Sequence, residues 1–299
     1  MAAGSLLRRS CPLCGGVDTR PFVNNGFFDY DRCPGCALVF QNPTVDPQAV
    51  NDGFTGSDEL LEDYFKISAK YKTGVPTKPD PRSHGKLRDI YGVRPEGRLL
   101  DVGCSVGDFL HLAKYFYDVE GVEVNPATTA IAAQHFRVHC GFLSDLRLPL
   151  VYDIVTLNQI LYGVPDPVGL LRDIHAVLKT DGILCLNTPN SDSYATRLFG
   201  GKCCHFYGYT TQNVFNPEAL SHLCAKAGFR ILTMRTEWLD IYTADLREFY
   251  DRPDRFIHKR NTHLPDYERG FVVEDEAQRQ LGQNLGQRGN YLVALLVKS

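Results

Sequence analysis

The sequence has no apolar run approaching the roughly 20 residues that a membrane-spanning helix needs. Its charge is nearly balanced, with 32 Lys and Arg against 35 Asp and Glu, which gives no electrostatic reason to expect a polyanionic partner. The stretch 1–10 contains arginines but no apolar core, so it does not predict a secretory signal. These absences favour a globular protein without a membrane or nucleic-acid partner.

Regular cysteine spacing is also scarce. The chain has 10 cysteines in 299 residues, but only one group of them has the spacing of a known framework. This usage indicates a reducing environment, and we expect a cytoplasmic protein. With 43% hydrophobic residues, the chain is long enough to bury one large core and a small attached module.

The one regular group is a pair of Cys-x-x-Cys knuckles near the start of the chain. In each knuckle two thiols lie three residues apart and can face a single metal ion. The two knuckles together predict a tetrahedral zinc site whose ligands are Cys11, Cys14, Cys33 and Cys36. The zinc would be structural because protein fills every ligand position. Gly15 and Gly35 suit the left-handed turns that such knuckles contain.

The strongest local pattern further along is a strand, a tight turn and a helix. An apolar run at 99–102 leads into the small residues 103–107, and a helix is predicted from Asp108. A turn of this kind lets a ligand approach bare backbone at the positive end of a helix. A second predicted strand, 119–124, carries the acid Glu123, which can accept hydrogen bonds from ribose hydroxyls.

Predicted strands and helices alternate from residue 98 onward, which indicates a parallel sheet with helices on both faces. Ligands of such sheets bind beyond the carboxyl ends of the strands. Several candidates lie at or shortly after the ends of predicted strands and are expected to meet at this edge, namely Gly103, Glu123, Leu143, Asn158 and the turn Pro189-Asn190.

The turn Asp101-x-Gly103-x-Ser105-x-Gly107 resembles the first motif of class I S-adenosylmethionine (SAM) methyltransferases. Later segments resemble that family in the same order, namely 152–157, 166–190 and 215–229. The resemblance implies an α/β, Rossmann-like class I methyltransferase sheet, mostly parallel with its last strand antiparallel. It divides the chain into a zinc ribbon (1–42), a linker with a helical lid segment (43–95) and a methyltransferase domain (96–299) with a cap insertion at 239–288.

The resemblance also implies roles for individual residues. Gly103, Ser105 and Gly107 would line the methionine part of SAM, and Asp101 would hold the loop amides or the SAM amino group. Glu123 would bind the ribose hydroxyls. The remaining cofactor contacts are assigned to Phe142, Leu143 and Asn158, with Phe142 placed against adenine. Ser105 replaces the usual glycine and is sterically tolerable only if its backbone angles stay ordinary.

The sequence departs from many relatives after the fourth predicted strand, where Tyr162 and Gly163 replace a Glu-His pair. A histidine base or metal ligand is therefore missing at that position. Histidine is the side chain best suited to remove a proton from the acceptor near neutral pH, and His205 is the best alternative candidate for the general base. A histidine bonded to the loop backbone is the competing interpretation. Tyr207 and Tyr209 would orient the acceptor or form the pocket wall.

The leading prediction is a SAM-dependent methyltransferase that methylates oxygen or carbon of a small molecule, of secondary-metabolite or sugar type. One alternative is an RNA methyltransferase that grips its substrate with the zinc ribbon. The ribbon has only Arg8, Arg9, Arg20 and Arg32 and no lysine, which is too little charge for a phosphate track. Another alternative is an inactive SAM-fold binding module. The ribbon itself is expected to wall the acceptor pocket or to form a homodimer contact.

Overall fold

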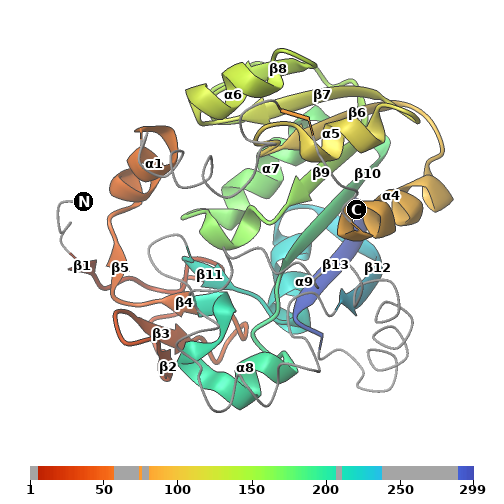
Figure 1. Ribbon diagram of the computed structural model, residues 1–299. Helices are drawn as coiled ribbons and strands as arrows, with labels where there is room; N and C mark the ends of the chain where they lie inside the picture. Colours follow the sequence, from red (N-terminus) through yellow and green to blue (C-terminus); the bar gives the residue numbers. More distant parts are fainter. Residues whose placement is uncertain (1–5, 57–73, 76–80, 207–210, 238–288) are drawn as a thin grey trace, which may run out of the picture.

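The computed structural model describes residues 6–56, 74–75, 81–206, 211–237 and 289–299 (Figure 1). The predicted cap insertion 239–288 and part of the lid segment lie outside the described residues. Among the helices that are described, none is long and apolar enough to cross a membrane.

A seven-stranded sheet forms the centre of the molecule, in the order β12-β13-β10-β9-β6-β7-β8. The five strands from β10 to β8 are parallel, and β13 runs antiparallel to both of its neighbours. This confirms the predicted mostly parallel sheet with an antiparallel last strand. The strands are β6 Arg98–Val102, β7 Asp118–Glu123, β8 Arg137–Cys140, β9 Tyr152–Asn158, β10 Leu178–Pro189, β12 Phe229–Glu237 and β13 Tyr291–Lys298.

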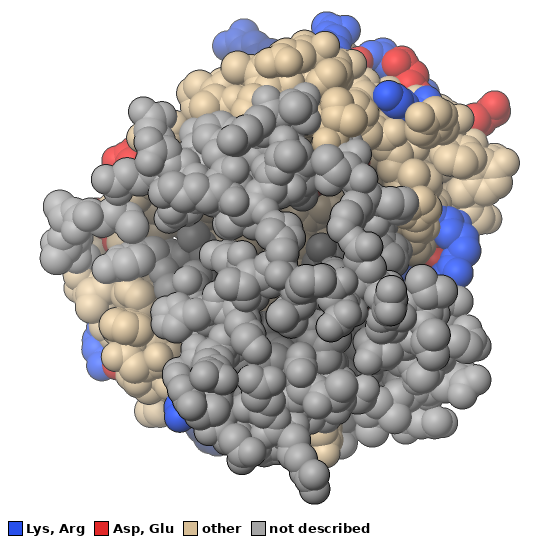
Figure 2. Space-filling model, viewed as in Figure 1, with Lys and Arg blue, Asp and Glu red and all other residues tan. Residues whose placement is uncertain are grey.

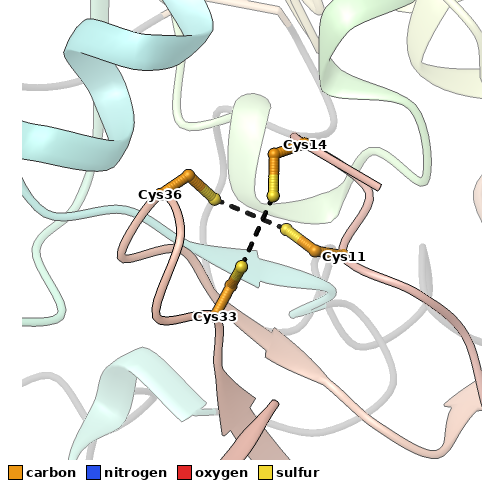
Figure 3. Close-up of side chains that lie close together, drawn as sticks. All are labelled: Cys11, Cys14, Cys33 and Cys36. Carbon is orange, nitrogen blue, oxygen red and sulfur yellow. Dashed lines mark hydrogen bonds between the residues drawn. The ribbon is translucent and has the colours of Figure 1, made fainter. Parts of the chain in front are cut away.

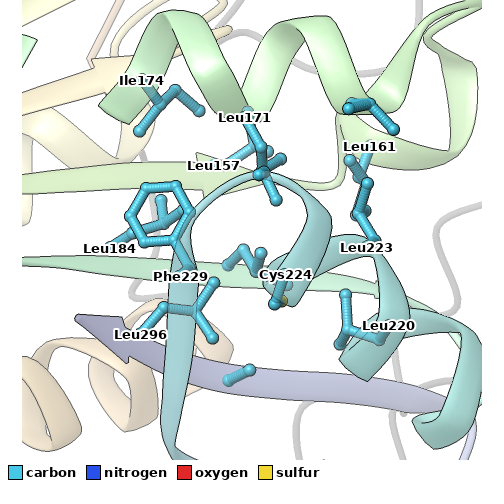
Figure 4. Packing of buried hydrophobic residues seen from close by; sticks show 14 of the residues in the cluster. Leu157, Leu161, Leu171, Ile174, Leu184, Leu220, Leu223, Cys224, Phe229 and Leu296 are labelled. Carbon is cyan, nitrogen blue, oxygen red and sulfur yellow. The ribbon is translucent and has the colours of Figure 1, made fainter. Parts of the chain in front are cut away.

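Helices cover both faces of this sheet because successive strand residues point to opposite sides. On one face, Leu99 and Ile154 are buried with residues of α4 (Pro81–Val93) and α5 (Asp108–Ala113). On the other face, Leu157 and Leu184 pack against α7 (Pro167–Val177) and α9 (Pro217–Lys226), as Figure 4 shows. The helix α6 (Pro126–Ala132) connects β7 and β8.

Three of these helices begin with the same local signal, an Asn or Asp followed by proline. Asn125, Asp166 and Asn216 are the N-cap residues of α6, α7 and α9, and each side chain accepts a hydrogen bond from a backbone N–H of the first turn. Proline in the next position costs nothing, because its missing N–H has no partner within the helix. The sequence therefore fixes where the helices after β7, β9 and β11 begin.

The strand β10 begins earlier than its sequence suggests. The pattern predicts a helix to Leu178 and a strand from Ile183, but α7 ends at Val177 and β10 runs from Leu178. The pairing of β10 with β9 is irregular between Leu178 and Ile183. Gly182 packs tightly there, since a Cβ on it would lie 2.8 Å from Leu178 side-chain atoms.

The cysteine-containing segment forms a second, four-stranded sheet in the order β11-β4-β3-β2. Its strands β2 (Arg20–Asn24), β3 (Asp29–Arg32) and β4 (Val39–Gln41) belong to the ribbon, whereas β11 (Asn213–Val214) comes from the chain after β10. The remaining elements are β1 Leu6–Leu7, β5 Thr44–Val45, α1 Pro47–Gly56, η1 Leu161–Gly163, α8 Tyr194–Phe199, η2 Gly200–Lys202 and η3 Cys204–Phe206.

The ribbon also shares a hydrophobic core with the main sheet. Leu13 and Leu38, next to the cysteines, belong to the same buried cluster as Leu220 and Leu223 of α9. The Lys226 ammonium at the end of α9 donates a hydrogen bond to the Leu13 carbonyl (2.6 Å). The ribbon is therefore packed against the core of the main sheet in the described structure.

Candidate functional site

The four cysteines of the two knuckles converge at one point, with their Sγ atoms all within 4.8 Å of one another (Figure 3). The Sγ atoms of Cys11 and Cys36 are 3.5 Å apart, and those of Cys14 and Cys33 are 3.4 Å apart. Sulfur atoms bound to one tetrahedral zinc lie about 3.8 Å apart, given Zn–S bonds of about 2.3 Å. Within the cluster the hydrogen bond between Cys11 and Cys36 lowers the pKa of Cys11 and raises that of Cys36, so the support for a metal comes from the positions of the four sulfur atoms. The set of ligands therefore fits a zinc ion.

The turns of the knuckles differ in one respect from the sequence prediction. Gly15 has the expected left-handed backbone, with φ of 78°. In the second knuckle the left-handed residue is Ala37, with φ of 60°, and not Gly35. Ala37 and Gly15 occupy the same position of their knuckles, because each donates its N–H to the carbonyl of the first cysteine. The prediction for Gly35 was wrong because it relied on residue type alone.

At the carboxyl ends of the strands, Glu123 links the loop after β6 to the loop after β7. Its Oε2 accepts a hydrogen bond from the Ser105 N–H (2.8 Å), and its Oε1 accepts one from the Asn125 N–H (2.9 Å). Glu123 is only 8% exposed, and burial raises its pKa. The carboxylate keeps lone pairs that can accept from further hydroxyl groups.

Asp101 lies at the same edge, on β6, and is buried almost completely. Its Oδ1 accepts hydrogen bonds from the Thr156 hydroxyl (2.6 Å) and from the Asn158 amide (2.9 Å). Burial raises the pKa of Asp101 to about 6, although these hydrogen bonds and the charge of Lys86 act in the opposite direction. Two of the predicted site residues, Asp101 and Asn158, are thus in direct contact.

Lys86 is a residue of this site that the sequence analysis missed. It lies on α4, is 5% exposed, and donates a hydrogen bond from Nζ to Asn158 Oδ1. Its ammonium also lies 5.7 Å from the centre of the Phe109 ring. The helix is held in place by Asp89, whose Oδ2 accepts from Arg235 Nε (2.9 Å). A lysine among helical surface residues gives no sequence signal of this kind, because only the packing of α4 makes it buried.

The glycine turn after β6 is shaped by the loop after β9. Gly103 has φ of 76°, and a Cβ on it would lie 2.4 Å from Ile160 Cδ1. Ser105 has φ of 51°, so the condition under which a serine fits here without strain, namely ordinary backbone angles, is not met. The hydrogen bond from its N–H to Glu123 holds it in this left-handed conformation. Gly107 also has a positive φ, of 92°, and precedes α5.

The predicted adenine contacts follow β8. Leu143 is buried in the core cluster that contains Val102 and Val122, whereas Phe142 is half-buried. The N–H of Gly141 donates to the Glu123 carbonyl (2.9 Å), which brings this loop to the strand that carries the acid. Their roles toward adenine stay predictions.

The acceptor-side candidates lie on the chain that follows β10. His205 belongs to η3, is 2% exposed, and packs edge-on against Tyr291 with ring centres 5.3 Å apart. Tyr291 starts β13 and pairs with Pro189 at the end of β10. His205 therefore lies near the same edge of the sheet, beyond β10 and β13. Tyr207 and Tyr209 lie outside the described residues.

An RNA-binding protein needs a continuous basic surface for the phosphate backbone. On the face shown in Figure 2, the Lys and Arg side chains of the described residues stand at the margin, interspersed with Asp and Glu. Arg32 of the ribbon is paired with Asp192 at 2.5 Å. The described part of this face has no continuous basic surface, and so it offers no track for a phosphate backbone.

This sheet and its strand-end carboxylates define the architecture of a Rossmann-like methyltransferase. A methyltransferase-domain family model matches residues 83–234, which is half of the chain. The chain belongs to this family of SAM-dependent methyltransferases.

Curated relatives share this region of the chain. The ubiquinone biosynthesis O-methyltransferase of Pseudomonas aeruginosa strain UCBPP-PA14 is 29% identical over 109 residues, which cover 33% of this chain and 47% of the relative. The protein of the same name from Haemophilus ducreyi is 33% identical over 107 residues, covering 31% and 45%. The protein of that name from Nitrosomonas europaea is 24% identical over 204 residues, which cover 60% of this chain and 85% of the relative. The first two matches thus span about half the length of the relatives.

Solved structures share the fold. A SAM-dependent methyltransferase from Archaeoglobus fulgidus superimposes with a TM-score of 0.51 at 17% identity, covering 81% of this chain and all of that one. A Haemonchus contortus phosphoethanolamine N-methyltransferase, solved with phosphomonomethylethanolamine and S-adenosylhomocysteine, also gives 0.51, at 14% identity, covering 87% and 62%. At these identities the likeness concerns the fold alone.

The left-handed conformation of Ser105 generates a stability prediction. Ser105→Gly should raise the free energy of unfolding by about 0.5–1 kcal/mol, because glycine adopts positive φ without strain while the N–H bond to Glu123 remains. Urea unfolding measures this. The control is Ser144→Gly, since Ser144 is an exposed turn residue without a positive φ and should lose stability. A loss at both positions would contradict the strain at Ser105.

Proposed function

We propose that this chain is a SAM-dependent methyltransferase that acts on a small-molecule acceptor. The observation that carries the proposal is the pair of buried carboxylates, Asp101 and Glu123, at the carboxyl ends of neighbouring strands. Burying two carboxylates is costly unless positive or hydrogen-bond-donating groups compensate. SAM carries an ammonium group and ribose hydroxyls, both of which donate hydrogen bonds, so the chemistry of this pair of carboxylates fits SAM.

Each residue at this edge has a proposed task. Glu123 accepts from the ribose hydroxyls while its backbone partners hold it still. Asp101 pairs with the ammonium group of SAM. Lys86 is held beside Asp101 through Asn158, and its positive charge balances the carboxylate of SAM. Gly103, Ser105 and Gly107 line the methionine part, and Phe142 and Leu143 the adenine.

SAM supplies a methyl group already activated by its sulfonium. The protein then needs to align the acceptor, exclude water and remove a proton where the acceptor carries one. We assign proton removal to His205, with Tyr207 and Tyr209 as pocket residues, because Tyr162 and Gly163 offer no histidine after β9. Since His205 is buried, its imidazole would act in a water-poor setting that favours a directed proton transfer.

Two observations favour a small-molecule acceptor. The relatives named above are O-methyltransferases of ubiquinone biosynthesis, and their names describe small-molecule chemistry. On the described part of the face in Figure 2, Lys and Arg side chains are interspersed with Asp and Glu and form no continuous basic surface of the kind that RNA binding uses. We propose methylation of oxygen or carbon, with zinc serving only to fold the ribbon.

The proposal is tested by incubating the full chain with radiolabelled SAM and a cell extract, followed by separation of small molecules from RNA. Label is expected in the small-molecule fraction. Label in RNA would overturn the acceptor class. Absence of label in both fractions, together with measurable SAM binding, would favour an inactive SAM-binding module.

The raised pKa of Asp101 predicts a pH dependence of SAM binding. Between the ordinary value of 3.8 and about 6, the ligand-free folded protein holds this proton more tightly than the unfolded chain, so this group makes stability fall as pH rises. The ammonium of SAM requires the ionised carboxylate. SAM affinity should therefore rise about tenfold from pH 5 to pH 7 and then level off.

Calorimetric titration at a series of pH values measures this effect. Asp101→Asn removes the titrating group and should bind SAM more weakly with a flat profile between pH 5 and pH 7. A steep profile that persists in Asp101→Asn would assign the titration to another group, with Glu123 as the first candidate.

The proposed zinc site generates a prediction about metal content and stability. Metal analysis should find one zinc per chain, and Cys33→Ser should lose it and lower the free energy of unfolding by several kcal/mol, because the ribbon core depends on the metal. SAM affinity of the folded fraction should stay unchanged. The control is Cys140→Ser, an exposed cysteine on β8 outside the cluster, which should keep the zinc. Retention of zinc by Cys33→Ser would contradict the assigned ligand.

A further inference from the structure

The hairpin formed by β2 and β3 of the ribbon packs against the short helix η3, which carries His205. The Asn25 side-chain amide donates from Nδ2 to the Phe206 carbonyl at 2.6 Å. The Phe206 ring packs edge-on against Tyr30, with ring centres 5.0 Å apart, and also contacts Phe22 at 6.2 Å. Phe206 is 2% exposed, so the hairpin fixes the residue next to His205 on both its backbone and its ring.

The same hairpin also holds the chain where it leaves this region. The Tyr30 hydroxyl donates to the Thr211 carbonyl at 3.1 Å. Tyr30 is fully buried, and it contacts Phe206 with its ring and Thr211 with its hydroxyl. Residues on both sides of 207–210 are thus bound to a single ribbon side chain.

Beyond Thr211, the chain becomes part of the ribbon sheet. Asn213 and Val214 of β11 pair with Phe40 and Val39 of β4. Next to this pairing lies a buried network in which Gln212 Nε2 donates to Gln41 Oε1 (2.9 Å) and the Thr44 hydroxyl donates to Gln212 Oε1 (2.5 Å). A buried amide without a hydrogen-bond partner destabilises the folded protein. Any other register of β11 on β4 would break this network, so the network fixes the register.

We infer that the zinc ribbon positions the acceptor-side segment of the enzyme, with Asn25 and Tyr30 as positioning residues that act through Phe206 and Thr211 on His205. The inference rests on the proposed function for the catalytic meaning of His205. Proton transfer and methyl transfer both require groups held within a fraction of an ångström. The SAM residues Asp101 and Glu123 use different partners, so the ribbon contacts should affect the acceptor step and leave SAM binding unchanged.

The test substitutes Asn25→Asp in the full, zinc-loaded chain. The carboxylate still accepts from the N–H groups of Phe27 and Phe28, which form the hairpin turn, but it cannot donate to the Phe206 carbonyl. The matched control is Asn24→Asp, which adds the same charge one residue earlier. In the interactions described, the Asn24 side chain bonds only within the hairpin, where it donates to Asp29 Oδ1 (2.7 Å) and accepts from the Gly26 N–H. Asn24→Asp therefore also loses a hairpin hydrogen bond, and it controls for weakening of the hairpin that does not involve Phe206.

Hydrogen–deuterium exchange in peptides covering 200–214 should rise at least about fivefold in Asn25→Asp, the effect of one lost hydrogen bond, and stay unchanged in Asn24→Asp. Exchange in 99–123 and SAM affinity should not change in either variant. With the small-molecule fraction of the cell extract as the source of acceptor and saturating SAM, methyl transfer should be about fivefold slower in Asn25→Asp, because the general base is less well positioned in the transition state.

Equal exchange in 200–214 for the two variants would overturn the inference, as would a loss of SAM affinity confined to Asn25→Asp. Tyr30→Phe gives an independent check if Asn25→Asp does not fold, because it removes only the hydroxyl bonded to Thr211. If the wild-type chain transfers no methyl group, the proposed function fails, while the exchange comparison still decides whether the ribbon holds this segment.

Discussion

Two carboxylates that are removed from water set the main constraint on this structure. Asp101 and Glu123 lie on adjacent parallel strands and are almost completely buried, which raises the pKa of both. Such groups are retained only where donors surround them. The turn after β6 bends so that the Ser105 N–H reaches Glu123, and β9 supplies Thr156 and Asn158 to Asp101. The shape of the strand-end site follows from these requirements.

The second organising feature is the four-cysteine cluster. We propose that the ribbon depends on a zinc ion at this cluster for its stability, because its own strands are short and the rest of its core is shared with α9. Once folded, it supplies the β4 edge on which β11 pairs and the hairpin that packs against η3. In Figure 1 the ribbon strands lie beside β11 and α8, away from β7 and β8, where the candidate ribose and adenine residues are. The two halves of the proposed reaction thus depend on different parts of the chain.

Much of this arrangement could be predicted from local sequence. The alternation of strands and helices, the Asn-Pro and Asp-Pro helix starts, the glycine turn and the two cysteine knuckles are all short-range signals. The features that were missed depend on tertiary contacts. Lys86 becomes a site residue only when α4 packs beside Asn158, 72 positions later. Pairing of the two-residue strand β11 with β4 and the left-handed conformation of Ser105 likewise depend on partners far away in the sequence. Ala37 is a local case, since the turn of its own knuckle sets its backbone and overrides residue preference.

If the buried Glu123 forms part of a SAM site, as we propose, calorimetric titration of the full chain with SAM should show it. The account predicts one SAM per chain and a loss of affinity of at least about tenfold in Glu123→Gln, because the amide cannot accept from both the backbone and the ribose. Glu96→Gln, at an exposed position before β6, should bind as the wild type does. Equal affinity in all three proteins, or no binding by the wild type, would contradict the account.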